Sequence, residues 1–341
     1  MKEMIILLVV CIVQAIPDTC LHNKNLVIQN TTTSDIINNH ETICDEDIKH
    51  FPNIVIGHIT PYYNRGKELA VKYAKKFDVI SPVWFIIEKS NDSYIIKGKE
   101  HYDKKFIEEI REANSQVKII PRYLFDRSTI LYFHQQSVMY HGEFIETMSK
   151  HIEEYNFDGI ELEVSGYILS VRSREYFVDL INLLGRSLHY SNKTLIITIY
   201  VHRSLTQPLF DLELFEELGN NVDYYNLLTN NYYTNHSHSP IQWLKSVIKN
   251  MKETAAADKF LIELTFSAYS ESVTGIPSTV ECLGLDFLRE EPTYTLWNEI
   301  TEEHLITKGY YQGNEYKEII AVIPSLYVNA NFNGVVNRKE D

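Results

Sequence analysis

Cysteine is scarce in this chain, and basic residues are outnumbered. Of 341 residues four are cysteine, and 32 lysines and arginines stand against 46 aspartates and glutamates, a formal net charge of −14. This acidic balance argues against a nucleic acid or an anionic membrane surface as a partner. So few cysteines cannot form a disulfide scaffold, so the fold must depend on its hydrophobic core. With 44% hydrophobic residues, the sequence can supply that core.

Long hydrophobic runs are also missing, apart from a short one at the N-terminus. Residues 4–13 are apolar after a charged start, and small or branched side chains follow at Val13 and Ala15. The run is too short to span a bilayer, so no membrane insertion is expected. The pattern predicts a signal peptide over residues 1–15 and a secreted or lysosomal protein.

Cleavage after residue 15 leaves three cysteines, Cys20, Cys44 and Cys282. An odd number permits at most one bridge within the chain, and we expect it to join Cys20 to Cys44, with the role of Cys282 open. Passage through the secretory pathway agrees with four N-glycosylation sequons. These begin at Asn30, Asn91, Asn192 and Asn235.

Motifs for metals and nucleotides are absent from the sequence as well. It has no CxxC pair, no HxxxH spacing and no glycine-rich turn after an early strand. The missing turn argues against a doubly wound dinucleotide-binding fold. We therefore expect neither a metal nor a cofactor.

Short β-rich segments alternate with amphipathic helical segments from residue 53 onward. The strand-like segments are 53–59, 78–87, 117–125, 157–164, 193–201, 222–229 and 259–269. The helical ones are 66–77, 104–114, 143–156, 174–189, 211–220 and 240–253. This alternation predicts parallel strands with helical crossovers, and seven such steps favour an α/β fold of the (β/α)₈ TIM-barrel type.

The ends of the chain depart from this regular pattern. Residues 16–50 are polar and are interpreted as an irregular N-terminal arm, so the barrel is expected over 51–341. A Tyr-rich stretch at 270–317 breaks the alternation and predicts an insertion after the seventh strand. No convincing eighth strand follows, and only residues 334–336 could serve as one. The barrel is therefore expected to be incomplete there.

The segment FDGIELEVS (157–165) contains the acidic residues that are the main candidates for a functional site. Side chains alternate along a strand, so Glu161, Glu163 and Ser165 should all point into the barrel. The segment resembles the fourth-strand signature Asp-Gly-x-Asp-x-Asp-x-Glu of the glycoside hydrolase family 18 chitinases. By that resemblance Asp158 matches the first aspartate, Glu161 and Glu163 the inner ones, and Ser165 the catalytic glutamate.

Five segments in order resemble one branch of that family, a branch that also lacks the catalytic glutamate. They are ITPYYNRG, FDVISPVWF, KIIPRYLF, FDGIELEV and SPIQWLKS. A second departure lies in LLTNN, where Asn230 and Asn231 stand at the Tyr and Asp positions that support the acetamido group in active relatives. The resemblance therefore implies a barrel without catalytic residues.

Residues at the expected C-terminal strand ends are candidates for saccharide binding, because aromatic faces stack on sugar rings and amides and carboxylates bind hydroxyls. They are Tyr62, Trp84, Tyr123, Glu163, Asn230, Asn231 and Tyr232. Packing is the alternative for each aromatic residue. For Glu161 and Glu163 it is a polar network with Arg122 or a tyrosine hydroxyl.

Three functions remain open at this point. The first is a catalytically inactive chitinase-like protein that binds chitooligosaccharides or related glycans. The second is a glycosidase that acts on N-acetylglucosamine polymers through a relocated carboxylate, with Glu163 as the candidate acid. The third is a protein-interaction module with a vestigial cleft and a sorting receptor or an immune protein as its partner. A serine at the acid position favours the first, since a hydroxyl cannot protonate a leaving group near neutral pH.

Overall fold

The computed structural model describes most of the region predicted as the barrel and parts of the remaining chain. The described ranges are 32–39, 47–49, 51–61, 64–90, 93–127, 129, 141–164, 174–201, 212–229, 240–252, 254, 256–264, 268–271, 277–280, 293–299, 303–308, 311–312, 315–316 and 319–324. The predicted signal peptide, all four cysteines and residues 334–336 lie outside them.

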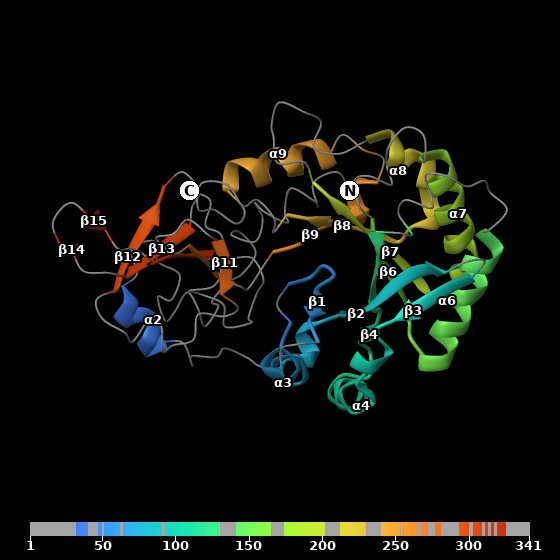
Figure 1. The fold of residues 1–341 in the computed structure, drawn as a ribbon, viewed down its shortest axis with the longest axis horizontal. Coiled ribbons are helices and arrows are strands. Elements are labelled where there is room, and N and C mark those ends of the chain that lie inside the picture. The colour runs from blue at the N-terminus through green and yellow to red at the C-terminus, as the bar shows by residue number, and fades with distance from the viewer. Residues whose placement is uncertain are drawn as a thin grey trace.

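Within the described residues the main sheet has nine strands, and seven parallel ones form its continuous path in the same order as in the sequence (Figure 1). They are β1 (Ile56–Ile59), β2 (Val79–Ser90), β5 (Arg122–Phe125), β6 (Gly159–Val164), β7 (Thr194–Tyr200), β8 (Tyr224–Leu228) and β9 (Phe260–Ile262). Each coincides with a strand predicted from the sequence. The sheet curls into a half-barrel, and within the described residues no strand pairs with the outer edge of β1 or β9. The α/β fold of the (β/α)₈ type is confirmed, and the described part of the sheet is consistent with the expected incompleteness at the eighth strand.

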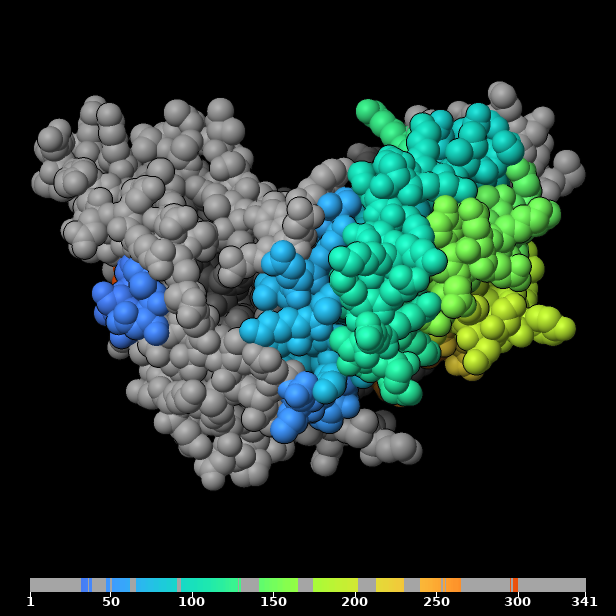
Figure 2. All heavy atoms as spheres, turned by 90° about the horizontal axis from the view of Figure 1, so that it is seen from below, coloured from blue at the N-terminus to red at the C-terminus, as the bar shows by residue number. Residues whose placement is uncertain are grey.

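Helices connect these strands and cover the convex side of the sheet (Figures 1 and 2). They are α3 (Asn64–Lys72), α4 (Lys104–Ala113), α6 (His141–Tyr155), α7 (Arg174–Tyr190), α8 (Leu212–Leu218) and α9 (Ile241–Met251). Single 3₁₀ turns occupy Ala74–Lys76, Lys99–His101, Gly219–Asn221 and Ala257–Lys259. Helix α4 illustrates why these segments form helices that pack on the sheet. The Asp103 carboxylate caps it by accepting from the Phe106 amide, and Phe106 and Ile110 on one face are buried.

Strand β6 shows how the sheet divides its side chains between two environments. Ile160 and Leu162 are fully buried in the core between sheet and helices, whereas Glu161 and Glu163 alternate with them and point into the half-barrel. Below these carboxylates an apolar layer fills the concave side of the sheet. It comprises Val79, Ile120 and Ile196, with Ile56 and Tyr224 packed against them. Helix α9 packs onto the barrel through Trp243, whose side chain is buried.

Two strand features differ from the prediction. The segment predicted as one strand at 117–125 is split into β4 (Lys118–Ile119) and β5, because Pro121 lies between them and has no amide hydrogen for the ladder. The second feature is an added hairpin. Strand β3 (Ser93–Lys97) pairs antiparallel with the end of β2, and its alternating buried Tyr94 and Ile96 are a strand signal that sequence reasoning overlooked.

The N-terminal arm is not entirely irregular, which corrects the prediction. Helix α2 (Thr33–Asn39) begins at a capping box, in which the Thr32 amide donates to the Asp35 carboxylate and the Asp35 amide donates to the Thr32 hydroxyl. The Thr33 hydroxyl lies 3.0 Å from that of Thr295 in strand β12 (Thr293–Asn298). The described part of the arm therefore contacts the region after the seventh strand.

That region forms a second, antiparallel sheet, as an insertion would. Its strands lie in the order β11 (Pro277–Val280), β10 (Ala268–Glu271), β16 (Ile319–Pro324), β13 (Glu303–Lys308) and β12 (Thr293–Asn298). A separate pair joins β14 (Tyr311–Gln312) to β15 (Glu315–Tyr316). This sheet extends over 268–324, beyond the predicted limits of 270–317, and strand β9 ends at Ile262 rather than at 269. Within the described residues, no helix is long and apolar enough to cross a membrane.

Candidate active site

A layer of polar side chains lies inside the half-barrel, directly above the apolar layer. Each of the seven parallel strands, or the residue that follows it, contributes one member. The members are His58, Ser81, Arg122, Glu161, Thr198, Asn226 and Glu263. The layer lies on the side of the apolar layer that faces the C-terminal strand ends, and (β/α)₈ proteins hold their active sites at that end of the barrel. We call this set the polar layer.

Glu161 is the centre of the polar layer. Its side chain is fully buried. Its carboxylate is bonded to five side chains, those of His58, Ser81, Arg122, Thr198 and Asn226. Burial opposes ionisation, but the charges of His58 and Arg122, together with these hydrogen bonds, hold the pKa of Glu161 well below its usual range. Glu161 is therefore an ionised carboxylate with no proton to donate.

Arg122 links Glu161 to a second carboxylate. Its Nε lies 3.1 Å from Glu161 Oε1, and its Nη2 lies 2.6 Å from Glu263 Oε2. Asn226 also donates to Glu263, at 2.7 Å. The surrounding carboxylates outweigh the burial of the guanidinium and raise the pKa of Arg122. Arg122 thus remains charged and joins strand β5 to the end of strand β9.

Glu163 lies one inward position nearer the open end of strand β6 and has a different environment. Its Oε1 accepts a hydrogen bond from the Tyr200 hydroxyl at 3.0 Å, and its Oε2 lies 3.7 Å from Arg122 Nε. Burial raises the pKa of the Glu163 carboxyl, with further contributions from Glu263 and Glu161, and Arg122 only partly opposes this effect. The side chain is 13% exposed. Glu163 is thus more accessible than Glu161 and more easily protonated.

The interpretation of Glu161 and Glu163 as members of a polar network is confirmed. Arg122 and the Tyr200 hydroxyl are the partners that this interpretation required. Asp158, the first acid of the motif, lies at the other end of the strand. It accepts from the Ile119 amide and from Arg111, so it holds β4 and α4 to the sheet rather than contributing to the polar layer.

Trp84 and Tyr123 were predicted to bind sugar, and the structure shows that this prediction is wrong for both. Trp84 is 2% exposed and packs edge-on against Tyr102 and Phe106. Tyr123 is fully buried, and its hydroxyl is bonded to His151 of helix α6. Both side chains therefore fill the core between sheet and helices, where a saccharide cannot reach them. The packing alternative is correct for both.

The remaining predicted site residues lie outside the described residues. They are Tyr62, Ser165, Asn230, Asn231 and Tyr232, together with the sequon residues Asn30, Asn91 and Asn235. Asn192 is described, is exposed and has a φ of 55° in the turn between α7 and β7. Its turn precedes strand β7 and therefore lies at the end of the half-barrel opposite Glu163 and Tyr200.

Sequence reasoning missed five members of the polar layer. They are His58, Ser81, Thr198, Asn226 and Glu263. Each is a polar residue within or directly after an otherwise apolar strand, and that interruption was the available signal. Their convergence on Glu161 required the register between strands, which a single sequence does not reveal.

Three members of the polar layer could supply metal ligands, since ligand atoms of His58, Glu161 and Glu263 all lie within 4.8 Å of one another. The Arg122 guanidinium, however, is already bonded to both carboxylates. A cation at this position would have to displace Arg122 or lie beside its positive charge. The residues present therefore do not fit a metal.

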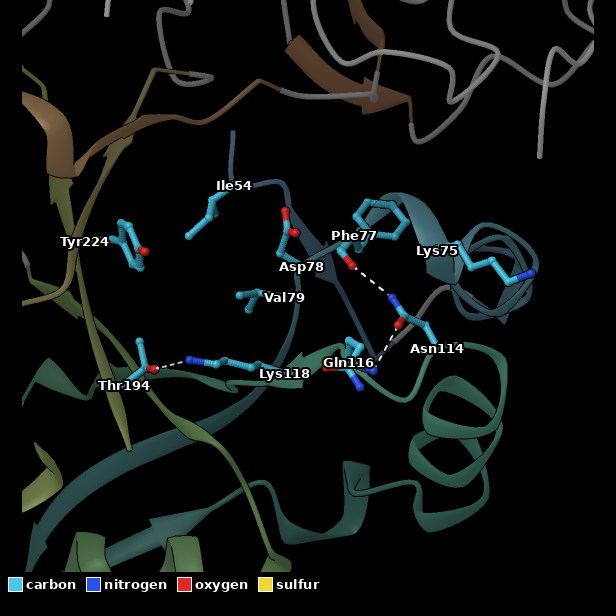
Figure 3. Close-up of a pocket in the computed structure, with 10 residues that line it drawn as sticks. All are labelled: Ile54, Lys75, Phe77, Asp78, Val79, Asn114, Gln116, Lys118, Thr194 and Tyr224. Carbon is cyan, nitrogen blue, oxygen red and sulfur yellow. Dashed lines mark hydrogen bonds between the residues drawn. The ribbon is translucent and has the colours of Figure 1, made fainter. Parts of the chain in front are cut away.

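A cavity of about 430 Å³ opens at the opposite end of the half-barrel (Figure 3). Its lining includes Asp78, Lys118, Thr194 and Tyr224, each of which stands at or just before the start of a strand. Lys118 Nζ donates to the Thr194 hydroxyl at 3.1 Å (Figure 3). Active sites of (β/α)₈ proteins lie at the C-terminal strand ends, so this cavity is separate from the candidate site.

The chain belongs to the glycosyl hydrolases of family 18, whose sequence pattern matches residues 85–318, more than half of its length. Solved structures agree on the fold. A chitinase from Chromobacterium violaceum is 15% identical with a TM-score of 0.63, covering 80% of this chain and 86% of that chain. A class V chitinase from Pseudomonas fluorescens is 18% identical with a TM-score of 0.62, covering 80% and 87%. The Ostrinia furnacalis Group IV chitinase, solved in complex with allosamidin, is 11% identical with a TM-score of 0.59, covering 81% and 86%.

Proposed function

We propose that this family 18 protein binds saccharides in the half-barrel without hydrolysing them. The observation that carries the proposal is that strand β6 and the residue after it do not place a carboxylic acid at the catalytic position. Ser165 stands in the sequence where the family motif places the catalytic glutamate. The nearest inward acid of the described strand is Glu163, and the next, Glu161, is buried and ionised. Glycoside hydrolysis requires a carboxylic acid beside the leaving oxygen, and a serine hydroxyl cannot replace it.

The polar layer supports saccharide binding on physical grounds. The side chains of His58, Glu163 and Glu263 are 18%, 13% and 9% exposed inside the half-barrel, and an imidazole and carboxylates form hydrogen bonds with sugar hydroxyls. Tyr200 adds an aromatic ring there that is 44% exposed. Chitooligosaccharides and related glycans are the proposed ligands.

Within the family, we place the chain near chitinase domain-containing protein 1, the stabilin-interacting chitinase-like protein. The support is the five ordered segments described above, which run over most of the barrel, and the shared loss of the catalytic glutamate. By the same resemblance we propose a secreted or lysosomal location after removal of residues 1–15. N-glycans at the four sequons would follow from that location.

Glu163 supports a second candidate function, a glycosidase with a relocated acid. Its pKa is raised by burial, as a general acid requires, and it is the accessible acid of strand β6. Against this role, Glu163 lies one inward step below Ser165, roughly 6–7 Å along the strand by strand rise. A substrate would have to enter deeper to reach it.

Incubation of the purified protein with a fluorogenic chitooligosaccharide separates these two functions. We expect no turnover above that of the Glu163→Gln variant. Turnover that Glu163→Gln abolishes, in a variant with unchanged unfolding temperature, would establish the glycosidase instead. Binding is measured separately by titration calorimetry with N-acetylglucosamine oligomers. If no oligomer binds at millimolar concentration, saccharide binding is wrong, and a protein-interaction module with a sorting receptor or an immune protein as partner becomes the better explanation.

A further inference from the structure

The charges at the open end of the half-barrel do not balance, and this bears on which saccharide the site takes. Three carboxylates, those of Glu161, Glu163 and Glu263, share the single guanidinium of Arg122. Among the described residues, the other basic group beside these carboxylates is His58, whose Nε2 lies 2.9 Å from Glu161 and whose Nδ1 lies 3.9 Å from Glu263. In the described part of the site, three acidic side chains therefore face two basic ones.

The unbalanced charge is located mainly on Glu163. Glu161 is fully buried and satisfied by five partners, and Glu263 accepts from both Arg122 and Asn226. Glu163 has one hydrogen bond, from Tyr200 to Oε1. Within the described residues its Oε2 accepts no hydrogen bond and has only Arg122 nearby, at 3.7 Å. This oxygen belongs to a side chain that is 13% exposed at the open end, so a ligand can reach it.

Tyr200 places an aromatic ring beside the Glu163 carboxylate, because its hydroxyl donates to Oε1. It lies two residues after Thr198 on strand β7, and Thr198 is in register with Glu163, so all three side chains point into the half-barrel. Its hydroxyl is held by Glu163, while 44% of its surface remains exposed. A pyranose ring that stacks on Tyr200 would bring a ring substituent close to the Glu163 carboxylate.

The chemistry of the substituent then decides specificity. An ammonium group has a positive charge and three donors, which suits a carboxylate with an unused oxygen beside other carboxylates. An acetamido group is neutral, has one N–H donor and needs a donor for its carbonyl oxygen. The Tyr200 hydroxyl and the Arg122 guanidinium, which are the described donors beside Glu163, are already bonded to carboxylates.

We propose that the site prefers saccharides with free amino groups, such as glucosamine oligomers, over their N-acetylated counterparts, with Glu163 as the ammonium acceptor and Tyr200 as the ring platform. The inference rests on the proposed saccharide-binding function and names the ligand class of that site. It assigns Glu163 a role that no hydrolytic step requires.

Titration calorimetry with two hexamers of equal length tests the proposal, one of glucosamine and one of N-acetylglucosamine. The measurements are made at about pH 6, below the usual pKa of amines such as the α-amino group, so that the glucosamine is cationic. We expect the glucosamine hexamer to bind about tenfold more tightly or better, the effect of a charge-assisted hydrogen bond, and to weaken as salt increases.

Two variants test whether the preference for the glucosamine hexamer depends on Glu163. Glu163→Gln keeps the size of the side chain and removes its charge, so it should lose at least about tenfold in affinity for the glucosamine hexamer and little for the acetylated one. Glu216→Gln, an exposed position on helix α8, controls for the general attraction of a cation to an acidic protein and should change neither affinity. The unfolding temperature of each variant confirms that it is folded.

Three outcomes overturn the proposal, and they differ in what they imply. If the acetylated hexamer binds equally well or better and Glu163→Gln changes nothing, the preference for amino sugars is wrong while saccharide binding stands. If neither hexamer binds the folded protein, the proposed function fails and the preference fails with it. A loss of affinity shared equally by Glu163→Gln and Glu216→Gln would mean nonspecific charge attraction, and would also overturn the role of Glu163.

Discussion

Arg122 and Glu263 lie 141 positions apart in the sequence, yet their side chains meet at 2.6 Å inside the half-barrel. The contact joins strand β5 to the residue after strand β9, two elements that are not neighbours in the sheet. Because Glu161 and Glu163 face the same guanidinium, the stability of the site depends on Arg122 more than on any other cation there.

The first prediction concerns that cation. Replacing Arg122 with Met leaves Glu161 and Glu263 buried without their main counter-charge, so we expect a loss of about 3–5 kcal/mol in the free energy of unfolding. Urea denaturation followed by circular dichroism measures it. Arg186→Met, at an exposed position on helix α7, should change stability by less than about 0.5 kcal/mol. Equal effects of the two substitutions would show that the polar layer contributes nothing special to stability.

Glu163→Gln should not lower the free energy of unfolding at neutral pH, in contrast to Arg122→Met. The folded-state pKa of Glu163 is raised, so ionisation of this group weakens the fold as pH rises through that pKa. We therefore expect the variant to be at least as stable as the natural protein at pH 7. The difference should vanish below about pH 4, where Glu163 is protonated in the folded and the unfolded chain alike. Thermal unfolding from pH 4 to 8 measures this, and a less stable variant at pH 7 would contradict it.

The lowered pKa of His151 leads us to expect a second effect of pH on the stability of the fold. Burial lowers the pKa of this histidine to about 4, and its Nδ1 is bonded to the Tyr123 hydroxyl. The unfolded chain takes up a proton near pH 6.5 and the folded chain only near 4, so stability should fall as pH decreases between these values. The expected loss is on the order of 2 kcal/mol.

The His151→Phe variant isolates this contribution. It should flatten the pH dependence between about 6.5 and 4 while costing about 1 kcal/mol at neutral pH, because the buried Tyr123 hydroxyl loses its partner. Denaturant unfolding at several pH values provides the comparison. An unchanged pH profile in the variant would assign the effect to other groups.

Gly159 tests the packing of strand β6 on β7. A Cβ atom at this position would lie 2.1 Å from the Thr194 carbonyl oxygen, which is backbone and cannot move aside easily. We expect Gly159→Ala to cost about 2–3 kcal/mol in the free energy of unfolding. Gly142→Ala is the matched control, since nothing lies within 4 Å of its added methyl group in helix α6. That variant should gain up to about 1 kcal/mol from helix propensity.

The sequence was sufficient for the order of the elements but not for the site. Hydrophobic periodicity identified all seven parallel strands, because their core faces need apolar side chains at every second position. It missed helix α2, where the signal lay in the Thr32–Asp35 capping box rather than in an apolar stripe. It assigned Trp84 and Tyr123 to a sugar site because an aromatic residue in a strand looks the same whichever face it occupies. The register between β2 and β5 shifts between Val83 and Phe85, which makes simple alternation unreliable in that part of β2.

Glu161 also has a consequence for how the chain finds its structure. This one buried anion draws its partners from strands β1, β2, β5, β7 and β8, each through a single side chain. If any of those strands slipped by one residue, its polar side chain would turn to the helix-covered face, and the fully buried carboxylate would lose a partner. A register error in any one of these five strands would therefore destabilise the sheet through the same two oxygens, those of the Glu161 carboxylate, so this one group favours the correct register of all five.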